Sequence, residues 1–408
     1  MNLTIERLGL HGDGIAEGPV YAARTLPGEI VTGDIDGDRI ASPKIVTPSD
    51  QRVKPVCPHY ARCGGCALQH ARDDFVADWK QEVVRSALAA HGIDVPFRPL
   101  VTSPPNSRRR ATFSGRRLRK GALVGFHTRG SDNLVPIPDC TLLTHELLQG
   151  LPMLEALTGR VGSRKGEVGF AVTASEEGLD VDISVEREFD AVMVGELAAL
   201  ARTYDLARIS RNSEPVLTRR APHVDFDGVL VVPPPGAFLQ ATPEGERALR
   251  SAVTEAVGGA KHILDLFAGC GTFALPLAKR AQIHAVEGEA EMTDALHQAW
   301  RQAKGLKNVT VEARDLFRRP LMPDEMKKAD AIVIDPPRAG AEAQVAQIAE
   351  ANVDRIAFVS CNPVTFARDA NILQQAGYRL NWVQVVDQFR WSAHIELAAS
   401  FTAPHIAV

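Results

Sequence analysis

The sequence predicts an α/β protein whose C-terminal part is a doubly wound sheet, preceded by a small β module and a middle region with a cysteine cluster. From His262 onward, short apolar runs alternate with segments of helical spacing. A glycine turn at residues 269–271 follows the first of these runs. Three cysteines gather within residues 57–66, far from these strands. We expect three domains, at residues 1–52, 53–235 and 236–408.

Length, composition and charge limit the class of protein. The chain has 408 residues, 45% hydrophobic and 24% charged, which is typical of two or three globular domains. No apolar stretch is long enough to span a bilayer, and the first residues lack the features of a signal peptide. We therefore expect a cytoplasmic protein whose six cysteines bind metal or act in catalysis. Because the net charge is −4, any basic surface must be local.

The first fifty residues contain short β-type runs separated by glycine turns. These runs are Leu3–Leu8, Pro19–Ala22, Glu29–Ile35 and Pro43–Thr47. Several short strands with tight turns predict a small barrel or sandwich. A barrel of the oligonucleotide-binding type and a β module without a specific role are both compatible with this segment.

A strong ligand signal follows, with C-x5-C-x2-C spacing around two glycines that let the backbone fold tightly. Its members are Cys57, Cys63 and Cys66. Cys140 is the best candidate for a fourth ligand. Four thiolates suit either a single zinc ion or an iron–sulfur cluster. We expect His59 and His70 to be solvated loop residues.

The middle region combines a helix with a basic segment. Residues 73–91 have helical spacing, and Gly92 ends the helix. Residues 107–120 hold seven basic side chains in fourteen positions and continue into the apolar run 122–126, which predicts a hairpin. This segment is either a phosphate-contacting patch or a solvated surface. Residues 141–235 alternate helical and strand patterns without a catalytic constellation.

The C-terminal region has the most regular pattern. A helix is expected after the turn at 233–236, to about residue 257. Strands are expected at 262–267, 283–287, 309–313, 331–335, 356–360, 380–386 and 395–401, with helices at 272–278 and 364–376 among the segments between them. Cys361 stands where a strand passes into a helix, at the edge where ligands bind in such sheets. The position of Cys361 alone is equally compatible with two roles, a catalytic nucleophile and a buried apolar thiol of the core.

Three features favour S-adenosylmethionine over a dinucleotide as the ligand of this sheet. The glycine turn lacks the third glycine of the dinucleotide fingerprint. Glu287 ends the second strand, 22 residues after Asp265, where it can bind ribose hydroxyls. Asp335-Pro336-Pro337 is similar to the Asp/Asn-Pro-Pro motif of base methyltransferases, but Arg338 replaces the aromatic residue typical of amine methylation. Cys270, within the glycine turn, is expected to pack.

A methyl donor together with a strand-end thiol predicts methylation at carbon 5 of a pyrimidine. A thiolate that adds to carbon 6 makes carbon 5 nucleophilic enough to attack the methyl group. A base must then remove the carbon 5 proton so that the thiolate can leave. Cys361 is the candidate nucleophile, and Glu396 is the best candidate base.

Taken together, these motifs resemble the bacterial iron–sulfur RNA (uracil-5-)-methyltransferases, above all those that act on 23S ribosomal RNA. The matching segments are Cys57-x5-Cys63-Gly-Gly-Cys66-x2-Gln69-His70, Cys140, Phe238-Leu-Gln240, Asp265-Leu-Phe-x-Gly-x-Gly271, Asp335-Pro-Pro-Arg338, Ser360-Cys361-Asn-Pro363 and His394-Ile-Glu396. They run in order through most of the chain and are specific in combination.

The resemblance implies a TRAM-like N-terminal barrel, a central domain that holds a [4Fe-4S] cluster on the four cysteines, and a class I S-adenosylmethionine-dependent methyltransferase domain. It implies that part of residues 71–100 packs on the methyltransferase domain, and that Phe238 can stack on RNA bases. The residues that it places around S-adenosylmethionine and uracil are Gln240, Phe267, Thr272, Glu287, Asp315 and Asp335. We expect a monomer that modifies an unpaired or loop uridine of RNA and binds no membrane.

Three alternatives are set against 23S ribosomal RNA as the substrate. A transfer-RNA uridine methyltransferase is the first, although the best-known member of that kind lacks the barrel and the cysteine cluster. An RNA cytosine-5-methyltransferase shares the thiol chemistry but commonly has a second cysteine where this chain has Pro337-Arg338. A metal-stabilised RNA-binding module without activity is the third, and the presence of Cys361, Glu396 and Asp335 argues against it.

Overall fold

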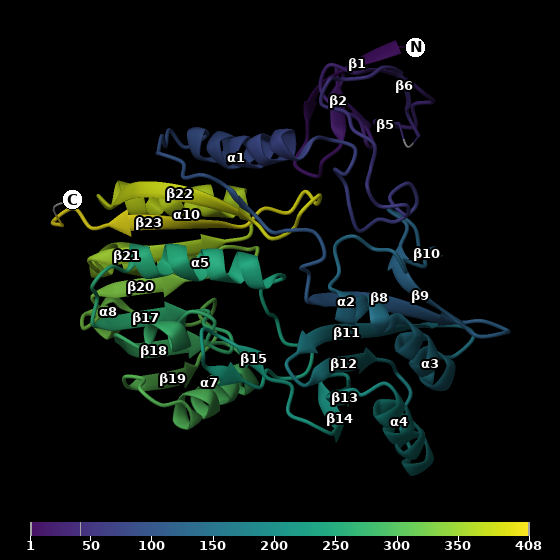
Figure 1. Cartoon of the computed structure of the whole chain (residues 1–408). Helices are drawn as coiled ribbons and strands as arrows, with labels where there is room; N and C mark the ends of the chain where they lie inside the picture. The colour runs from purple at the N-terminus through teal and green to yellow at the C-terminus, as the bar shows by residue number, and fades with distance from the viewer. Residues whose placement is uncertain (1, 41, 407–408) are drawn as a thin grey trace.

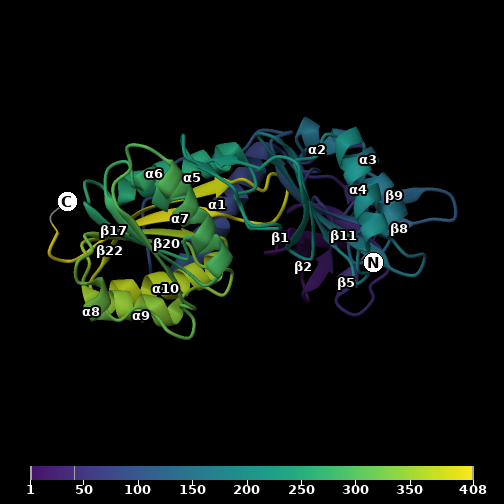
Figure 2. The ribbon, with the colours of Figure 1, turned by 90° about the horizontal axis from the view of Figure 1, so that it is seen from below.

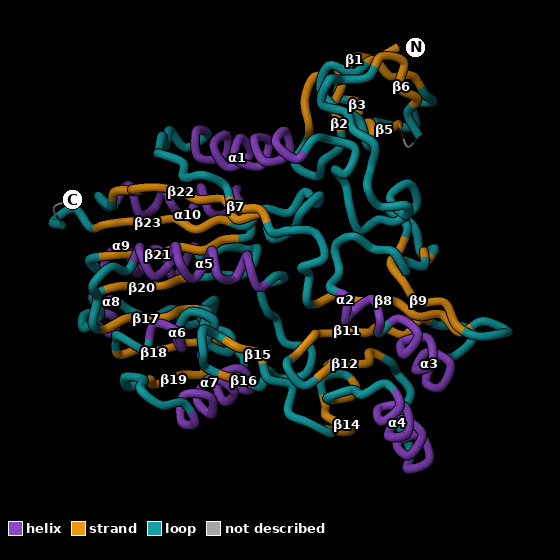
Figure 3. The backbone as a smooth tube through the Cα atoms, in the orientation of Figure 1, coloured by secondary structure: helices purple, strands orange, loops and turns teal. Residues whose placement is uncertain are grey.

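Three larger sheets follow one another along the chain, together with a two-stranded ribbon (Figure 1). A computed structural model describes residues 2–40 and 42–406. No helix in the described part of the chain is both long and apolar enough to cross a bilayer. The tube view shows how loops connect the N-terminal and middle sheets to the larger C-terminal unit (Figure 3).

The N-terminal six-stranded sheet is curled, with the strand order β5-β3-β2-β1-β4-β6. Its strands are β1 (Asn2–Leu8), β2 (Gly14–Ala16), β3 (Val20–Ala22), β4 (Ile30–Thr32), β5 (Arg39–Ile40) and β6 (Lys44–Thr47). The first half of β1 pairs with β4 and the second half with β2, with a bulge between Ile5 and Arg7. A bulge bends a strand, so β1 serves both halves of the curl.

This curled sheet is a TRAM-like half-barrel, where the resemblance implies a barrel. Within the described residues, its edge strands β5 and β6 are not paired with each other. The inner face buries a small apolar cluster that consists of Ile5, Ala16, Ala22, Val31 and Ile40. The strands beside β1 are short, at two to four residues each.

The middle seven-stranded sheet has the order β10-β9-β8-β11-β12-β13-β14. Its strands are β8 (Arg110–Arg117), β9 (Ala122–His127), β10 (Leu134–Val135), β11 (Glu167–Ser175), β12 (Gly178–Ser184), β13 (Arg208–Arg211) and β14 (Glu214–Thr218). The helices α2 (His145–Gln149), α3 (Leu151–Val161) and α4 (Ala191–Thr203) contribute buried leucines to its core. The basic segment forms the predicted hairpin, β8 and β9.

The C-terminal eight-stranded sheet has the order β19-β18-β17-β20-β21-β23-β22-β7. Its strands are β7 (Val101–Thr102), β17 (His262–Leu266), β18 (Gln282–Glu287), β19 (Val309–Ala313), β20 (Ala331–Ile334), β21 (Arg355–Ser360), β22 (Arg379–Asp387) and β23 (Leu397–Thr402). The five strands from β19 to β21 are parallel, and β23 runs antiparallel to both its neighbours. The strand order reverses between β17 and β20, where α/β sheets bind ligands.

Helices cover both faces of this sheet (Figure 2). One face packs on α5 (Pro243–Ala256), α6 (Ala274–Leu277) and α7 (Ala290–Gln302). The other packs on α1 (Asp73–Ala89), α8 (Pro323–Met326), α9 (Glu342–Ala351) and α10 (Pro363–Gln375). The ribbon of β15 (Val224–Asp225) and β16 (Leu230–Val231) completes the elements. Because α1 packs on α10 and β7 pairs with β22, residues before the middle sheet are part of the C-terminal unit.

Candidate active site

Cys361 lies where β21 passes into α10, at the carboxyl edge of the parallel strands. Asn362 holds this turn, because its Oδ1 accepts a hydrogen bond from the N–H of Val364 at 3.1 Å. The Nδ2 of Asn362 donates to the carbonyl of Arg338 at 2.9 Å. Pro363 then begins the helix with the backbone angle that a first helical residue needs. The thiol of Cys361 is therefore held partly exposed at a defined position.

Glu396 lies beside Cys361 because of the register between two neighbouring strands. In the antiparallel pair β21–β23, Ser360 is opposite Leu397. Cys361 follows Ser360 and Glu396 precedes Leu397, so the register brings the two functional residues to one corner of the sheet. The Glu396 side chain is buried, and its backbone carbonyl accepts a hydrogen bond from the N–H of Val386 at 2.8 Å.

The charges at this corner disfavour ionisation of the thiol and the carboxyls. Burial and the carboxylates of Glu396 and Asp335 raise the pKa of Cys361 to about 11, while the Arg338 guanidinium lowers it. Burial and Asp335 hold the pKa of Glu396 well above its ordinary value. Burial and Glu287 raise the pKa of Asp335 to about 7. Crowded carboxyl groups of this kind suit a cationic ligand, whose charge would favour their ionised forms.

Gln388 joins the residues of this corner and was not found from the sequence. Its Nε2 donates to Gln240 Oε1 at 2.5 Å and to Glu396 Oε2 at 3.1 Å. Its Oε1 accepts a hydrogen bond from the N–H of Ala241 at 2.7 Å. Gln240 in turn donates to Asp335 Oδ2 at 3.5 Å. The only signal in the sequence is that Gln388 directly follows a strand that ends at this edge.

Lys80 fixes the loop that carries this network. The side chain is fully buried on α1, and its Nζ donates to Asp387 Oδ1 at 2.6 Å. It also donates to the backbone carbonyls of His394 at 2.9 Å and Phe389 at 3.2 Å. The loop between β22 and β23 is thus held at both ends, which positions Gln388 and Glu396. Lys80 was not singled out from the sequence, because its partner Asp387 is 307 residues away.

The glycine turn after β17 lies against Glu287. The Glu287 carboxylate accepts hydrogen bonds from the N–H groups of Gly269 at 2.9 Å and Gly288 at 2.6 Å. Gly271 has φ +100°, and a Cβ there would lie 2.9 Å from Leu275, so only glycine fits. Phe267 also has positive φ, at 60°, which is unusual for a bulky residue and fixes the chain just before the turn.

A buried carboxylate supports a cationic ligand at this edge. Both side-chain oxygens of Asp265 are buried without a hydrogen-bond partner in the described part of the chain. Burial, then Asp335 and Glu287, holds the pKa of Asp265 well above its ordinary value. An orphaned buried carboxyl group is costly unless a ligand pairs with it. The residues present therefore fit S-adenosylmethionine, which carries a cationic sulfur and an amino group.

The remaining predicted cofactor residues lie at the same edge but outside the hydrogen-bonded network. The Asp315 carboxylate accepts from the N–H of Phe317 at 2.9 Å, and the Phe317 ring lies 5.5 Å from that of Phe267. Thr272 directly follows the glycine turn. The roles of Phe267, Thr272 and Asp315 stay predictions. Cys270 is fully buried in the core of the sheet, as predicted from its place in the turn.

The four cysteines of the middle region form a second cluster. Burial raises the pKa of Cys63, and the charges of Cys140 and Cys57 raise it further. Burial raises that of Cys66 to about 12, with contributions from the other three thiols. N–H donors point at two sulfurs: Gly65 at Cys63 (3.4 Å) and Gln69 at Cys66 (3.3 Å).

The donor set of this cluster suits a thiolate-bound group, since N–H donors stabilise negative sulfur. As the side chains are placed, however, no three histidine, cysteine, aspartate or glutamate groups in the described residues are arranged to hold a metal ion. The prediction that His70 is solvated is wrong. Its ring is buried, its Nδ1 is 2.7 Å from the hydroxyl of Tyr60, and burial lowers its pKa to about 4.

Most of the basic segment is engaged within the protein. Arg109 forms a buried ion pair with Glu246. Arg116 pairs with Glu167, and Arg117 donates to the carbonyl of Gly162. These partners have no sequence signal, and they show that the segment is not a uniformly solvated run. Contact of its exposed side chains with phosphates stays a prediction. The exposed basic side chains lie near the hairpin turn, at Arg117, Arg119 and Lys120.

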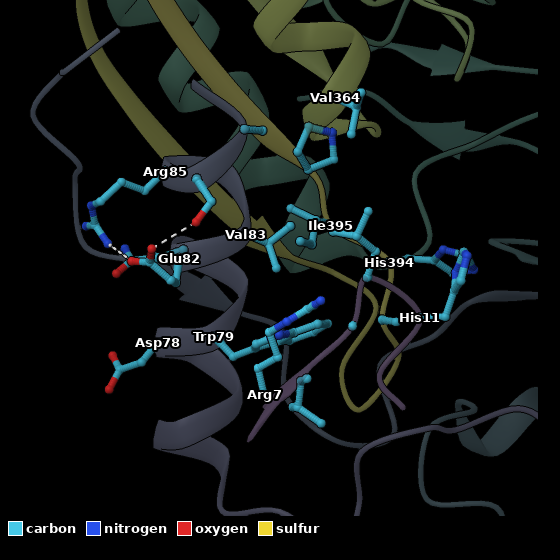
Figure 4. A pocket seen from close by; sticks show the side chains of 18 of the residues that line it. Arg7, His11, Asp78, Trp79, Glu82, Val83, Arg85, Val364, His394 and Ile395 are labelled. Carbon is cyan, nitrogen blue, oxygen red and sulfur yellow. Dashed lines mark hydrogen bonds and ion pairs between the residues drawn. The ribbon is translucent and has the colours of Figure 1, made fainter. Parts of the chain in front are cut away.

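Cys361 opens into a cavity of about 1060 Å³ between α1, the end of β1 and the loop before β23 (Figure 4). A second cavity of about 450 Å³ lies between this loop and the cysteine cluster. Both cavities are lined by Leu10, His11, Ala393 and His394. The thiol is thus accessible from outside through a cavity that reaches the N-terminal sheet.

Comparisons with known proteins show which proteins the chain is similar to. A family model described as tRNA (Uracil-5-)-methyltransferase matches residues 235–402. A Brucella suis protein described as an uncharacterized RNA methyltransferase is 42% identical over 403 residues, covering 98% of this chain and 97% of that protein. The 23S rRNA (uracil(1939)-C(5))-methyltransferase of Acinetobacter baylyi is 30% identical over 410 residues, covering 94% of this chain and 88% of that enzyme.

A solved structure shares the fold along the whole length. The tRNA (uracil-54, C5)-methyltransferase of Pyrococcus abyssi, in complex with S-adenosyl-L-homocysteine, superposes with a TM-score of 0.78. The likeness covers 98% of this chain and 99% of that chain at 22% identity. It shows that the curled N-terminal sheet, the middle sheet and the class I methyltransferase sheet occur together in a known fold.

Proposed function

Because the chain belongs to the RNA (uracil-5-)-methyltransferase family, we propose that its substrate is a uridine of 23S ribosomal RNA, methylated through Cys361 and Glu396. S-adenosylmethionine-dependent methylation of uracil carbon 5 in RNA is the activity of this enzyme family. The observation that carries the residue assignment is the register of β21 and β23, which places a strand-end thiol beside a buried carboxyl. Ribosomal RNA as the substrate would place the enzyme in the cytoplasm.

In the proposed reaction, Cys361 adds as a thiolate to carbon 6 of the uracil, and carbon 5 becomes nucleophilic. S-adenosylmethionine supplies an electrophilic methyl group on a cationic sulfur. The Glu396 carboxylate then takes the proton from carbon 5, and the sulfur–carbon 6 bond breaks to return the thiolate. Atoms balance, because one methyl group enters carbon 5 and one proton leaves it.

The other residues of the corner prepare this chemistry. The positive charge of Arg338 lowers the pKa of the Cys361 thiol, against the opposing effect of two carboxylates. Asp265, Asp335 and Glu287 lie where a cation would offset their mutual repulsion. We therefore propose that Gln240, Phe267, Thr272, Glu287, Asp315 and Asp335 hold the cofactor and the uracil. Gln388 orients the Glu396 carboxylate and the Gln240 amide.

The choice of ribosomal RNA rests on the ribosomal enzyme that is 30% identical over nearly the full chain. The presence of the N-terminal sheet and the cysteine cluster does not strengthen the choice of ribosomal RNA. A transfer-RNA enzyme shares the fold over 98% of this chain, which corrects the expectation that such modules indicate ribosomal RNA. The family model also carries a transfer-RNA description, so transfer RNA is the second candidate.

The first prediction tests the substrate. Unmodified transcripts of 23S ribosomal RNA and of transfer RNA, incubated with the enzyme and methyl-labelled donor, should show 5-methyluridine in the ribosomal transcript and only background label in transfer RNA. Mass mapping of the digested RNA identifies the modified nucleotide. Preferential labelling of transfer RNA would contradict the proposed substrate and leave the reaction intact, whereas 5-methylcytidine would contradict the reaction itself.

We further propose that the four clustered cysteines hold a [4Fe-4S] group, because the resemblance implies it and the N–H donors on Cys63 and Cys66 suit bound thiolates. The second prediction follows. Enzyme purified without oxygen should be brown, with iron and sulfide in comparable amounts, and Cys63→Ser should lose both and melt at lower temperature, since metal binding is coupled to folding.

The matched control for this prediction is Cys361→Ser, which lies outside the cluster and should keep its full iron content and melting temperature. A colourless wild-type protein with one zinc ion per chain would show that the site is a zinc site.

A further inference from the structure

The large cavity beside Cys361 has more room than one target base needs. Its volume is about 1060 Å³, whereas pockets for single small ligands measure about 300 to 1,000 Å³. Cys361 and Arg338 line the cavity beside the active site, and Arg7 of β1 lines it on the side of the N-terminal sheet. His11 lies beside His394 (Figure 4). An uninterrupted space therefore connects the thiol with the N-terminal sheet, and α1 lines it along one side.

Two aromatic residues of α1, Phe75 and Trp79, line this space, and Trp79 is the larger. In Figure 4, Trp79 points into the cavity, whereas Asp78 and Glu82 lie on the other side of the helix. Part of the indole packs beside the apolar cluster that includes Leu8 and Val76. The side chain is only partly buried, so it keeps an open surface. Packing accounts for one side of the ring and leaves the other available.

Charged side chains of both signs line the cavity around Trp79. Arg7, His11 and Arg338 are exposed, and so are the carboxylates of Glu6 and Asp78. Glu82 is neutralised by its ion pair with Arg85 at 2.8 Å, so this carboxylate adds little net charge. In Figure 4, Arg7 lies next to Trp79, so it is the basic side chain placed to meet a phosphate there. An aromatic surface beside a basic side chain is a feature of sites that hold single-stranded nucleic acid.

We propose that this cavity is a binding site for the nucleotide next to the target uridine, with its base stacked on Trp79 and its phosphate toward Arg7. The proposal rests on the proposed function, because a uridine must leave its stack to reach Cys361. Its neighbour then loses a stacking partner, and the indole replaces it. The RNA recognised is therefore unpaired for at least one nucleotide beyond the modified uridine.

The third prediction tests this site with a seven-nucleotide RNA that has one central uridine among adenosines, bound to the enzyme in the presence of S-adenosylhomocysteine. Removing the base, but not the phosphate, of one flanking nucleotide should weaken binding to the wild type about tenfold on one flank. In Trp79→Ala the intact RNA should bind about tenfold more weakly, and the same abasic change should have no further effect. Trp79→Phe should restore the response to the missing base.

Two matched controls accompany these variants. Trp300→Phe on α7 and Arg164→Ala on the middle region should bind like the wild type, whereas Arg7→Ala should weaken binding of intact and abasic RNA equally. If Trp79→Ala does not fold, the binding of intact and abasic RNA to the wild type and to Trp79→Phe still tests the proposal. Because a phenyl ring stacks on less area than an indole, removal of the base should weaken binding less in Trp79→Phe than in the wild type.

The outcomes separate this site from the proposed function. If the wild type methylates the oligonucleotide but neither abasic change weakens its binding, or the change costs the same in Trp79→Ala, the proposal is overturned and the methyltransferase assignment stands. If the wild type transfers no methyl group to any uridine, the proposed function fails, and the binding measurements judge the Trp79 site independently.

Discussion

Cys361→Ala is expected to lose methyl transfer to RNA by about 10⁶-fold, the scale seen when a covalent nucleophile is removed. Without the thiol no adduct forms at carbon 6, and carbon 5 stays too weak a nucleophile to attack the methyl group. Binding of RNA should change little, because the side chain is small and only partly exposed. The measurement is label transfer from methyl-labelled donor to a ribosomal RNA fragment, with binding followed in parallel.

RNA that contains 5-fluorouridine provides the control for this fourth prediction. The wild type should form a stable covalent complex with it, because fluorine at carbon 5 cannot leave as a proton does. Cys361→Ser and Cys361→Ala should form none, and both should melt within a few degrees of the wild type. Methylation by Cys361→Ala at an appreciable rate would exclude the covalent mechanism and require direct transfer.

The strands of the C-terminal sheet were predictable because they are buried on both faces. Runs such as Ala331–Ile334 and Arg355–Ser360 carry almost only apolar residues, as parallel strands under two layers of helices do. Because the strand that ends at Ser360 was recognised, the position of Cys361 at the edge of the sheet could be predicted as well. Shorter elements were missed: β2 and β5 have three and two residues, too few for any periodicity to show. The helix expected over 272–278 spans only Ala274–Leu277.

Contacts between segments that are distant in the chain could not be predicted from the sequence. Lysine is seldom buried, yet Lys80 is fully buried because Asp387 and two backbone carbonyls accept hydrogen bonds from it. Arg109 belongs to a basic run, yet it pairs with Glu246 on α5. Gln388 has no motif, and only its geometry links Gln240 with Glu396. In each case the partner lies in another element, and no local pattern reports it.

The fifth prediction concerns the other half of the mechanism. Glu396→Gln should add to the uracil and transfer the methyl group, then stall, with turnover reduced by about 10² to 10⁴-fold. An amide cannot take the carbon 5 proton, whereas its oxygen can still accept the hydrogen bond from Gln388. Addition itself should not suffer, because the Glu396 carboxylate raises the pKa of the Cys361 thiol and the substitution removes that charge.

The stalled Glu396→Gln enzyme should therefore appear as a protein–RNA complex that survives denaturing electrophoresis and carries one labelled methyl group per adduct. Glu350→Gln, an exposed carboxylate on α9, is the matched control and should turn over like the wild type without a trapped complex. Adding Cys361→Ala to Glu396→Gln should abolish the complex, since the adduct is formed by the thiol. Normal turnover by Glu396→Gln would mean that another group, or water, removes the proton. A trapped complex without methyl label would place Glu396 before methyl transfer, as a residue that prepares the thiol or the donor instead.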